Sequence, residues 1–205
     1  MLAVLVLCPL TVAWAQAPAP APADTTPASE LEAVVTTEFG SFRFEFADKA
    51  PKHAANFIKL ARDHYYDGSA FYRVGKAYIH GGDPLFKDPK TDRKDWGKGG
   101  LDMLTPELGA LSHVRGVVST YHSFRHTDGA QFFVMVSDAP SLDGGFSSFG
   151  RVTEGMDVVD KINSVPRSEN GIVNDLVRIK SITIEKKKAH TESKSAAVDP
   201  KTAKN

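Results

Sequence analysis

The sequence predicts a mainly β protein, an antiparallel barrel whose ends are covered by two helices. Seven or eight short segments either alternate apolar and polar residues or are rich in β-branched residues, as strands do. Only two segments space their apolar residues as a helix does, and they lie far apart in the chain. Because helices do not alternate regularly with strands, a doubly wound parallel sheet is disfavoured. Closure into a barrel would remove the exposed sheet edges.

The elements follow in chain order from these patterns. A hairpin is predicted over 32–46, because two alternating runs flank a turn at Gly40. A helix is predicted within 50–68, where Pro51 stands near the first turn. A second helix is predicted in 154–166, and the remaining strands are expected at 70–74, 77–81, 115–123, 130–137, 147–152 and 176–184.

Three features interrupt this regular pattern. Residues 82–114 contain several Gly and Pro residues and no periodicity. A stretch this long is typical of a functional or a disordered loop, or else argues against its assignment as a loop. Residues 123–129 are predicted to form a polar loop between two strands. In the last strand the alternation slips at Ser181, which predicts a β-bulge.

The two ends of the chain have compositions that do not suit a packed core. Residues 1–15 are apolar and end in an A-x-A-like cleavage site, so we interpret them as a signal peptide. An Ala/Pro-rich linker is expected at 16–30 and a Lys-rich, disordered tail at 186–205, which leaves 31–185 as the folded domain. The protein is therefore expected to be exported, to the periplasm or beyond if the cell is bacterial, without stable membrane insertion after signal removal.

The overall charge and the cysteine content exclude some classes of partner. The chain has 25 Lys+Arg and 25 Asp+Glu residues, so no strong field favours nucleic acid. The single cysteine, Cys8, lies in the predicted signal peptide, so no intramolecular disulfide can form. We expect a monomer.

Several motifs, in order along the chain, resemble the cyclophilin-type peptidyl-prolyl cis-trans isomerases. They are "GSFRFEFADKAPKHAANFIKLARDHYYDGSAFYRV", "HGGDP" and "TDGAQFFVMVSDAPSLDGGFSSFGRVTEGMDVVDKI". Together they cover nearly all of the predicted domain. The resemblance implies an eight-stranded antiparallel barrel capped by two α-helices, with a ligand groove on its outside and no cofactor or metal.

The resemblance also implies the activity, rotation about X–Pro peptide bonds, and a role in folding exported proteins. The barrier to this rotation is about 20 kcal/mol. A dry apolar pocket can hold the proline ring while a hydrogen-bond donor stabilises the twisted amide. The resemblance assigns the donor to Arg73, whose guanidinium stays charged. The substrates would be unfolded or extended proline-containing polypeptides, and the predicted binding residues are His80, Gln131, Phe133, Leu142, Phe146, Tyr121 and Tyr78.

The predicted groove departs from the usual pattern of the family. The stretch from Arg73 to the Gly-Gly-Asp turn is one residue shorter than usual. We hypothesise that Tyr78, Tyr121 and Phe146 rebuild an aromatic wall. The substituted positions are Ala77 for a pocket Phe, Tyr78 for Met, His80 for Gln, Tyr121 for a small residue, Ser141 for Trp and Phe146 for His.

Three other functions remain as alternatives. The altered groove is compatible with a catalytically weak proline-peptide-binding or chaperone-like module. His122 and His126 are four residues apart, with His113 nearby, and could form a metal site if they lay on a helix. A nucleophilic hydrolase is less favoured, because the sequence has no G-x-S-x-G motif.

Overall fold

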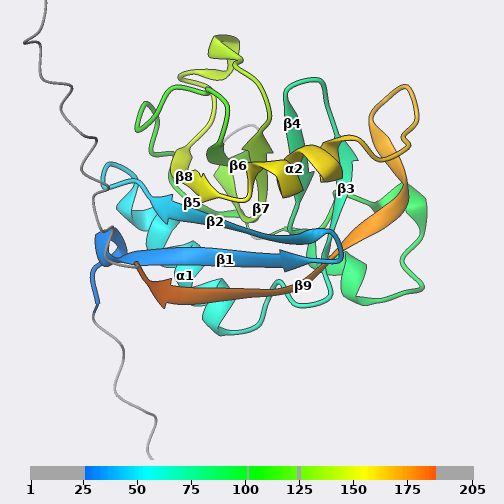
Figure 1. The fold of residues 1–205 in the computed structure, drawn as a ribbon, viewed down its shortest axis with the longest axis horizontal. Coiled ribbons are helices and arrows are strands. Elements are labelled where there is room, and N and C mark those ends of the chain that lie inside the picture. Colours follow the sequence, from blue (N-terminus) through cyan, green and yellow to red (C-terminus); the bar gives the residue numbers. More distant parts are fainter. Residues whose placement is uncertain (1–25, 101, 124–125, 188–205) are drawn as a thin grey trace, which may run out of the picture.

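The computed structural model describes residues 26–187, apart from 101 and 124–125 (Figure 1). Its strands are β1 Leu31–Thr37, β2 Gly40–Phe46, β3 Ala70–Val74, β4 Tyr78–Gly81, β5 Asp102–Leu104, β6 Val117–Ser123, β7 His126–Met135, β8 Ser148–Glu154 and β9 Ile172–Lys186. Its α-helices are α1 Pro51–Arg62 and α2 Met156–Asn163, and its 3-10 turns are η1 Ala28–Glu30, η2 Pro84–Lys87, η3 Arg93–Asp95 and η4 Pro140–Leu142.

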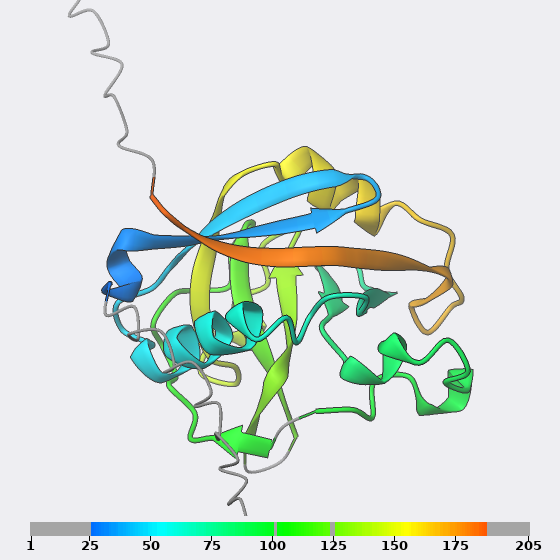
Figure 2. The same cartoon turned by 90° about the horizontal axis from the view of Figure 1, so that it is seen from below.

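The strands of the described residues form a closed antiparallel barrel, as the sequence predicts. They lie in the order β4-β3-β9-β1-β2-β8-β6-β7-β5, and β4 also pairs with β7. This pairing closes eight strands into a ring, and β5 extends the sheet from the far part of β7. Helix α1 packs against β7, β8 and β9, whereas α2 packs against β2, β3 and β4, so the helices cover different sides of the barrel (Figure 2).

Aromatic side chains fill the barrel interior because alternate strand residues point to the same face. In β2, Phe42 and Phe44 have no exposed surface. Phe57 of α1 reaches the same core, with its ring centroid 5.2 Å from that of Phe44 in an edge-on contact. The apolar faces of β2 and α1 therefore meet in one core.

Strand β7 separates the interior of the barrel from the surface where a ligand could bind. Phe132 and Val134 point into the main core and are fully buried. Gln131 and Phe133 point to the opposite face, where Phe133 belongs to a separate apolar cluster. The alternation along "QFFVMV" thus places one phenylalanine inside the barrel and the next one outside it.

The predicted polar loop at 123–129 is wrong over most of its length. Strand β6 continues to Ser123 and β7 already begins at His126, with these two residues paired. Asp128 pairs in turn with Asp102 of β5. The extended parts of β6 and β7 are held together by backbone hydrogen bonds, which residues of any side-chain type can form. The polar composition of the segment therefore did not reveal these strands.

The predicted bulge in the last strand is confirmed one residue from the predicted position. Thr36 of β1 pairs with Ser181 of β9, but the next residue, Thr37, pairs with Ile179. Lys180 is the additional residue. From one pair to the next, β9 thus advances by two residues while β1 advances by one. This extra residue defines a β-bulge, which bends the strand.

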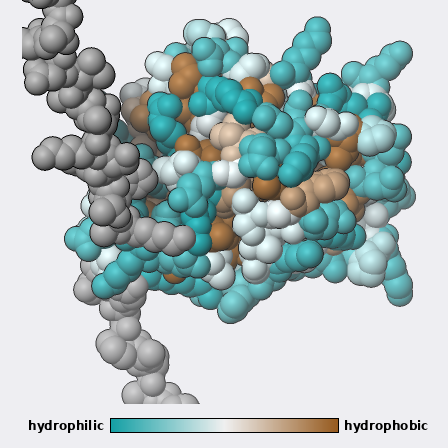
Figure 3. Space-filling model, viewed as in Figure 1, coloured by the Kyte–Doolittle hydropathy of each residue, from teal (hydrophilic) through white to brown (hydrophobic). Residues whose placement is uncertain are grey.

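The described residues contain no helix that is both long enough and apolar enough to span a bilayer. On the face shown in Figure 3, hydrophobic residues appear as separate areas among hydrophilic ones.

Candidate active site

A small apolar cavity opens on the outside of the barrel, where strands β4, β6 and β7 meet the segment around η4. Its volume is about 110 Å³, below the roughly 300–1,000 Å³ of typical sites for drug-sized ligands. Such a cavity suits one ring of a larger ligand. Six side chains line it: Tyr78, His80, Tyr121, Phe133, Leu142 and Phe146.

Phe133 is the centre of this aromatic cavity. The ring of Tyr78 packs against it with centroids 5.6 Å apart, and the ring of Phe146 meets it edge-on at 5.4 Å. Phe133 is only 4% exposed, so its ring is held by its neighbours. Tyr121 borders the same cavity. The three aromatic substitutions therefore lie together where the hypothesis of a rebuilt wall requires them.

The segment that carries Leu142 and Phe146 is anchored by a buried histidine. The backbone N–H of His113 donates to Asp143 Oδ1 at 2.7 Å, and its ring nitrogen Nδ1 lies 2.8 Å from the same oxygen. These two hydrogen bonds, the backbone one first, lower the pKa of the Asp143 carboxyl. The His113 ring also stacks on Phe133 with centroids 6.0 Å apart and a 19° interplanar angle. His113 thus positions Phe133, which forms the floor of the cavity, and the segment of Leu142 and Phe146, which forms one of its walls.

Ser119 completes a Ser-His-Asp array that sequence reasoning missed, because its members are distant in the chain. Ser119 Oγ lies 2.8 Å from His113 Nε2. The serine has no exposed surface, however, so a substrate cannot reach it. Both ring nitrogens of His113 are occupied, which also makes this residue unavailable to a metal. The side chains of His122 and His126 are not among those that the structure describes. Among the described side chains, no three that could bind a metal ion lie close together.

A chain of hydrogen bonds determines which nitrogen of His80 carries its proton. The amide nitrogen of Gln131 donates to the carbonyls of Gly97, at 3.1 Å, and Gly99. Its oxygen therefore faces Tyr72, whose hydroxyl donates to it at 3.0 Å. With its only proton used, the Tyr72 oxygen accepts at 3.2 Å from His80 Nδ1, so Nδ1 holds the proton and Nε2 has a bare lone pair.

The Nε2 atom of His80 has no hydrogen-bond partner within the part of the chain that is described. The residue is 2% exposed, and the ring of Tyr121 lies against it with centroids 4.9 Å apart. Burial, and secondarily the charge of Arg73, lowers the pKa of His80 to about 3. His80 is thus a neutral hydrogen-bond acceptor at the cavity, where the family usually has a glutamine amide that both donates and accepts.

Gln131, the seventh predicted binding residue, does not line the cavity. It is 1% exposed, and its amide is engaged by Tyr72 and by the 97–99 segment. That segment is held from its other side by the Asp83 carboxylate, which accepts from the backbone N–H of Gly97 at 2.8 Å. The sequence did not indicate this use of Gln131, because its partners lie about thirty residues away in the unpatterned stretch 82–114.

Arg73 lies beside the cavity rather than in its wall. It pairs with His80 across strands β3 and β4, and it lines a neighbouring hollow of about 490 Å³ that shares Tyr78 with the cavity. No hydrogen bond or ion pair of its guanidinium occurs among the described residues. Its effect on the pKa of His80 places its charge within electrostatic reach of the cavity.

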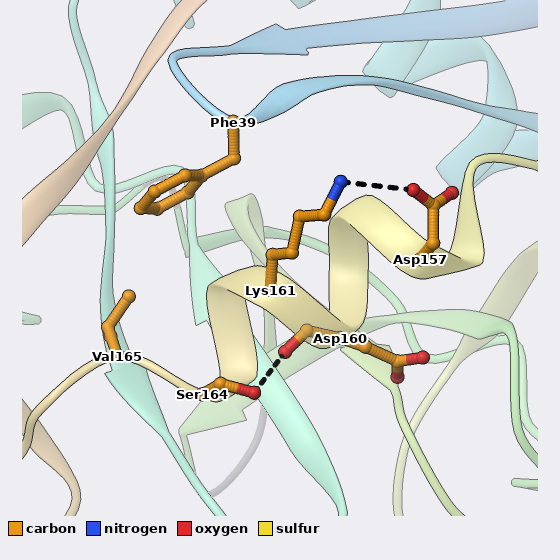
Figure 4. Close-up of a pocket in the computed structure, with 6 residues that line it drawn as sticks. All are labelled: Phe39, Asp157, Asp160, Lys161, Ser164 and Val165. Atoms are coloured by element: carbon orange, nitrogen blue, oxygen red, sulfur yellow. Dashed lines mark hydrogen bonds and ion pairs between the residues drawn. The ribbon is translucent and has the colours of Figure 1, made fainter.

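Another hollow, of about 600 Å³, lies between the β1–β2 turn and α2 (Figure 4). Phe39, which is 40% exposed, points over the helix there. The polar groups beneath it bond locally: Lys161 Nζ lies 3.3 Å from Asp157, and the Ser164 hydroxyl donates to the Asp160 carbonyl at 2.7 Å. None of the predicted site residues lines this hollow.

Comparison with known proteins identifies the family to which the barrel belongs. The family model described as "Cyclophilin type peptidyl-prolyl cis-trans isomerase/CLD" matches residues 33–184. The chain belongs to the cyclophilin-type peptidyl-prolyl cis-trans isomerase family. Members of this family are isomerases that act on X–Pro bonds, and this is the activity that the comparisons support for the chain.

Individual cyclophilins agree with this assignment. The chain is 36% identical over 158 residues to peptidyl-prolyl cis-trans isomerase-like 3 of Gallus gallus, covering 75% of this chain and 96% of that protein. It is 37% identical over 152 residues to peptidyl-prolyl cis-trans isomerase-like 2 of Rhizopus delemar, covering 73% of this chain but only 28% of the fungal protein. A crystal structure of a cyclophilin-type isomerase from Cryptosporidium parvum superposes with a TM-score of 0.68, at 27% identity, covering 76% of this chain and 99% of that one.

Proposed function

We propose that this cyclophilin isomerises X–Pro bonds of extended or unfolded polypeptides by holding the proline ring in the aromatic cavity while Arg73 stabilises the twisted amide. The observation that carries this proposal is the cavity itself: six of the residues expected to bind substrate converge on one ring-sized apolar recess. The Cryptosporidium parvum relative was crystallised in the presence of the dipeptide Ala-Pro, a ligand of the chemistry that such a recess would take.

The aromatic recess can lower the barrier by separating the two halves of the substrate. The proline ring would rest on Phe133, while the preceding residue turns outside the recess. Burial of the ring against apolar side chains removes apolar surface from water and favours binding. Rotation of the amide breaks no bond and requires no nucleophile, so the recess needs only to bind the ring and leave the other half free.

Arg73 would supply the interaction that strengthens only in the twisted state. The lone pair of the prolyl nitrogen is delocalised in the planar amide and becomes a hydrogen-bond acceptor as the bond rotates. A guanidinium N–H directed at this nitrogen stabilises the transition state more than the ground state, which is the condition for catalysis. For this role the guanidinium must turn from its hollow, past Tyr78, toward the cavity; the lack of a described hydrogen-bond partner favours that movement.

The test compares the isomerisation of a proline peptide by wild type, Arg73→Ala and Arg73→Lys. We expect Arg73→Ala to lower kcat/KM about 100-fold or more, the usual effect of removing one transition-state donor. Arg73→Lys keeps the charge but loses the fork of donors, so an intermediate loss is expected. The free energy of unfolding should change by less than about 0.5 kcal/mol, because the side chain is half-exposed.

Two results would change the proposal. Unchanged turnover in Arg73→Ala would remove Arg73 from the mechanism. Binding of the peptide by wild type without measurable isomerisation would favour the alternative, a catalytically weak proline-peptide-binding or chaperone-like module.

We also propose that the protein is exported and acts on polypeptides outside the cytoplasm. The apolar segment 1–15 with its A-x-A-like end and the following Ala/Pro-rich segment support this, and residues 1–25 lie outside the described residues. N-terminal sequencing of the mature protein from cell fractions tests it. Processing at residue 16 in an envelope or extracellular fraction would support export, and an unprocessed N-terminus in the cytoplasm would overturn it.

A further inference from the structure

The hollow that contains Arg73 is distinct in character from the aromatic cavity. Three basic side chains, those of Arg73, Lys76 and Arg167, line it, and Glu169 is the one acidic residue among its lining residues. Lys76 and Arg167 are exposed, and Arg73 is half-buried. The hollow therefore carries an excess of positive charge directly beside the proposed site of the proline ring.

Most of these charged side chains have no hydrogen-bond or ion-pair partner among the described residues. The side chains of Lys76 and Glu169 have no hydrogen bond or ion pair among the described residues, and the same holds for the guanidinium of Arg73. Arg167 donates one described hydrogen bond, from Nη1 to the carbonyl of Asn163 at 2.7 Å. Because a guanidinium has five N–H donors, this bond orients Arg167 and leaves donors for a ligand.

The walls of the hollow are two turns that are fixed to each other. The backbone N–H of Val74 donates to the carbonyl of Gly171 at 2.8 Å. Gly171 has φ +84°, and a Cβ there would lie 2.7 Å from the Val74 oxygen, so the close approach requires glycine. Asn163 holds the first turn as well, donating from Nδ2 to the carbonyls of Gly75 at 3.0 Å and Tyr78 at 3.3 Å. Figure 1 shows these turns next to each other, one after β3 and the other before β9.

Tyr78 connects this basic hollow to the aromatic cavity, because it lines both. An extended peptide advances about 3.3 Å per residue, so a chain with its proline in the cavity brings neighbouring side chains to the hollow. Guanidinium groups pair with carboxylates through two parallel hydrogen bonds, and an ammonium adds charge. A carboxylate side chain is therefore the peptide group that best fits the hollow.

We propose that Lys76 and Arg167, which line the hollow beside Arg73, bind an Asp or Glu side chain of the polypeptide whose proline occupies the cavity. The protein thus selects X–Pro bonds that have an acidic residue close by. This inference rests on the proposed function, since it takes the cavity as the proline site. Glu169 competes with the incoming carboxylate and limits the preference.

The experiment uses a set of fluorescent peptides that contain Ala-Pro. Each peptide carries either Glu or its neutral isostere Gln at one of four positions, which are the two before and the two after the Ala-Pro pair. Peptide binding is measured by fluorescence anisotropy and isomerisation by kcat/KM. At low salt, wild type should prefer Glu at one of these positions by about two- to fivefold for each ion pair formed, and 1 M NaCl should abolish the preference.

Variants then locate the preference. Lys76→Gln with Arg167→Gln should lose it while the neutral peptide is still isomerised, and Glu169→Gln should increase it. Lys180→Gln is the matched control, because it removes an equally exposed positive charge from β9, outside the hollow, and should keep the preference. Retained turnover of the neutral peptide also shows that each variant is folded.

The failure of this inference can be distinguished from the failure of the proposed function. Equal binding and turnover of the Glu and Gln peptides at all four positions would overturn the acidic preference while leaving the isomerase intact. A preference that survives in the double variant would likewise overturn it. A Glu preference in binding without any turnover would support the hollow and reject the isomerase.

Discussion

The aromatic cavity and the basic hollow share the side chain of Tyr78 but are constructed differently. The cavity is small, about 110 Å³, and is lined mainly by aromatic side chains on strands of the barrel. The hollow is larger, about 490 Å³, and apart from Arg73 of β3 its charged side chains lie on two turns. Strands position the buried surface that binds a ring, whereas turns present charges to solvent.

The difference in burial determines the charge of the two neighbouring groups. His80, paired with Arg73 across β3 and β4, is buried, and its pKa is lowered to about 3, so it is neutral at physiological pH. Arg73 remains charged at the edge of the hollow, because a guanidinium does not lose its proton in proteins. A neutral acceptor and a permanent donor thus lie on neighbouring strands, and the proposed mechanism uses the donor when the lone pair of the amide nitrogen becomes localised.

The largest effect is expected from removing the floor of the cavity. Phe133→Ala should lower the free energy of unfolding by about 3 kcal/mol or more, since it deletes a ring that is 4% exposed. Urea denaturation measures this, and Phe133→Leu should cost less because it leaves a smaller void. A loss below about 1 kcal/mol in Phe133→Ala would show that the cavity wall is not packed as described.

A second effect concerns the buried acceptor of the cavity and depends on pH. Folded His80 stays neutral down to about pH 3, whereas a histidine in the unfolded chain takes up a proton below its ordinary pKa of 6.5. Between these two pH values the unfolded state binds more protons than the folded state. The contribution of His80 should therefore lower the free energy of unfolding by about 1.4 kcal/mol for each unit by which the pH falls. This stability is present above pH 6.5 and is lost as the pH falls.

The variant His80→Gln should reduce this pH slope by that amount, as measured by urea denaturation from about pH 7 to about pH 4. His64→Gln is the matched control, because the side chain of His64 is 78% exposed. An equal slope in wild type and His80→Gln would contradict a neutral His80 in the folded protein.

The smallest effect is expected in the hollow, whose shape depends on hydrogen bonds rather than on packing. Asn163→Ala removes the two donors to Gly75 and Tyr78 and should cost about 1–2 kcal/mol of unfolding free energy. Thermal or urea denaturation would detect this loss. Ser164→Ala serves for comparison, since it removes an exposed bond within the helix, and should change stability by less than about 0.5 kcal/mol. Equal losses in both variants would mean that Asn163 does not hold the turn.

The alternation of side chains along strands made much of the fold and part of the site predictable. A period of two residues was enough to separate Phe132 from Phe133 and to place Phe42 and Phe44 inside the barrel. The same period placed Gln131 on the outer face together with Phe133, which is correct. It could not show that a distant segment covers Gln131, because the carbonyls of Gly97 and Gly99 come from a stretch without periodicity.

The sequence by itself therefore determined which side of each strand is buried, because alternation is a local property of the chain. The residues around the cavity were predicted from the resemblance of the sequence motifs to the cyclophilin family. Only the tertiary structure decided the hydrogen-bonding state of His80 and the surroundings of Arg73. The proton of His80 is placed through Tyr72 and Gln131, and the hollow of Arg73 is completed by Gly171 and its neighbours. These partners lie far apart in sequence, and they meet only when the strands have closed into a ring.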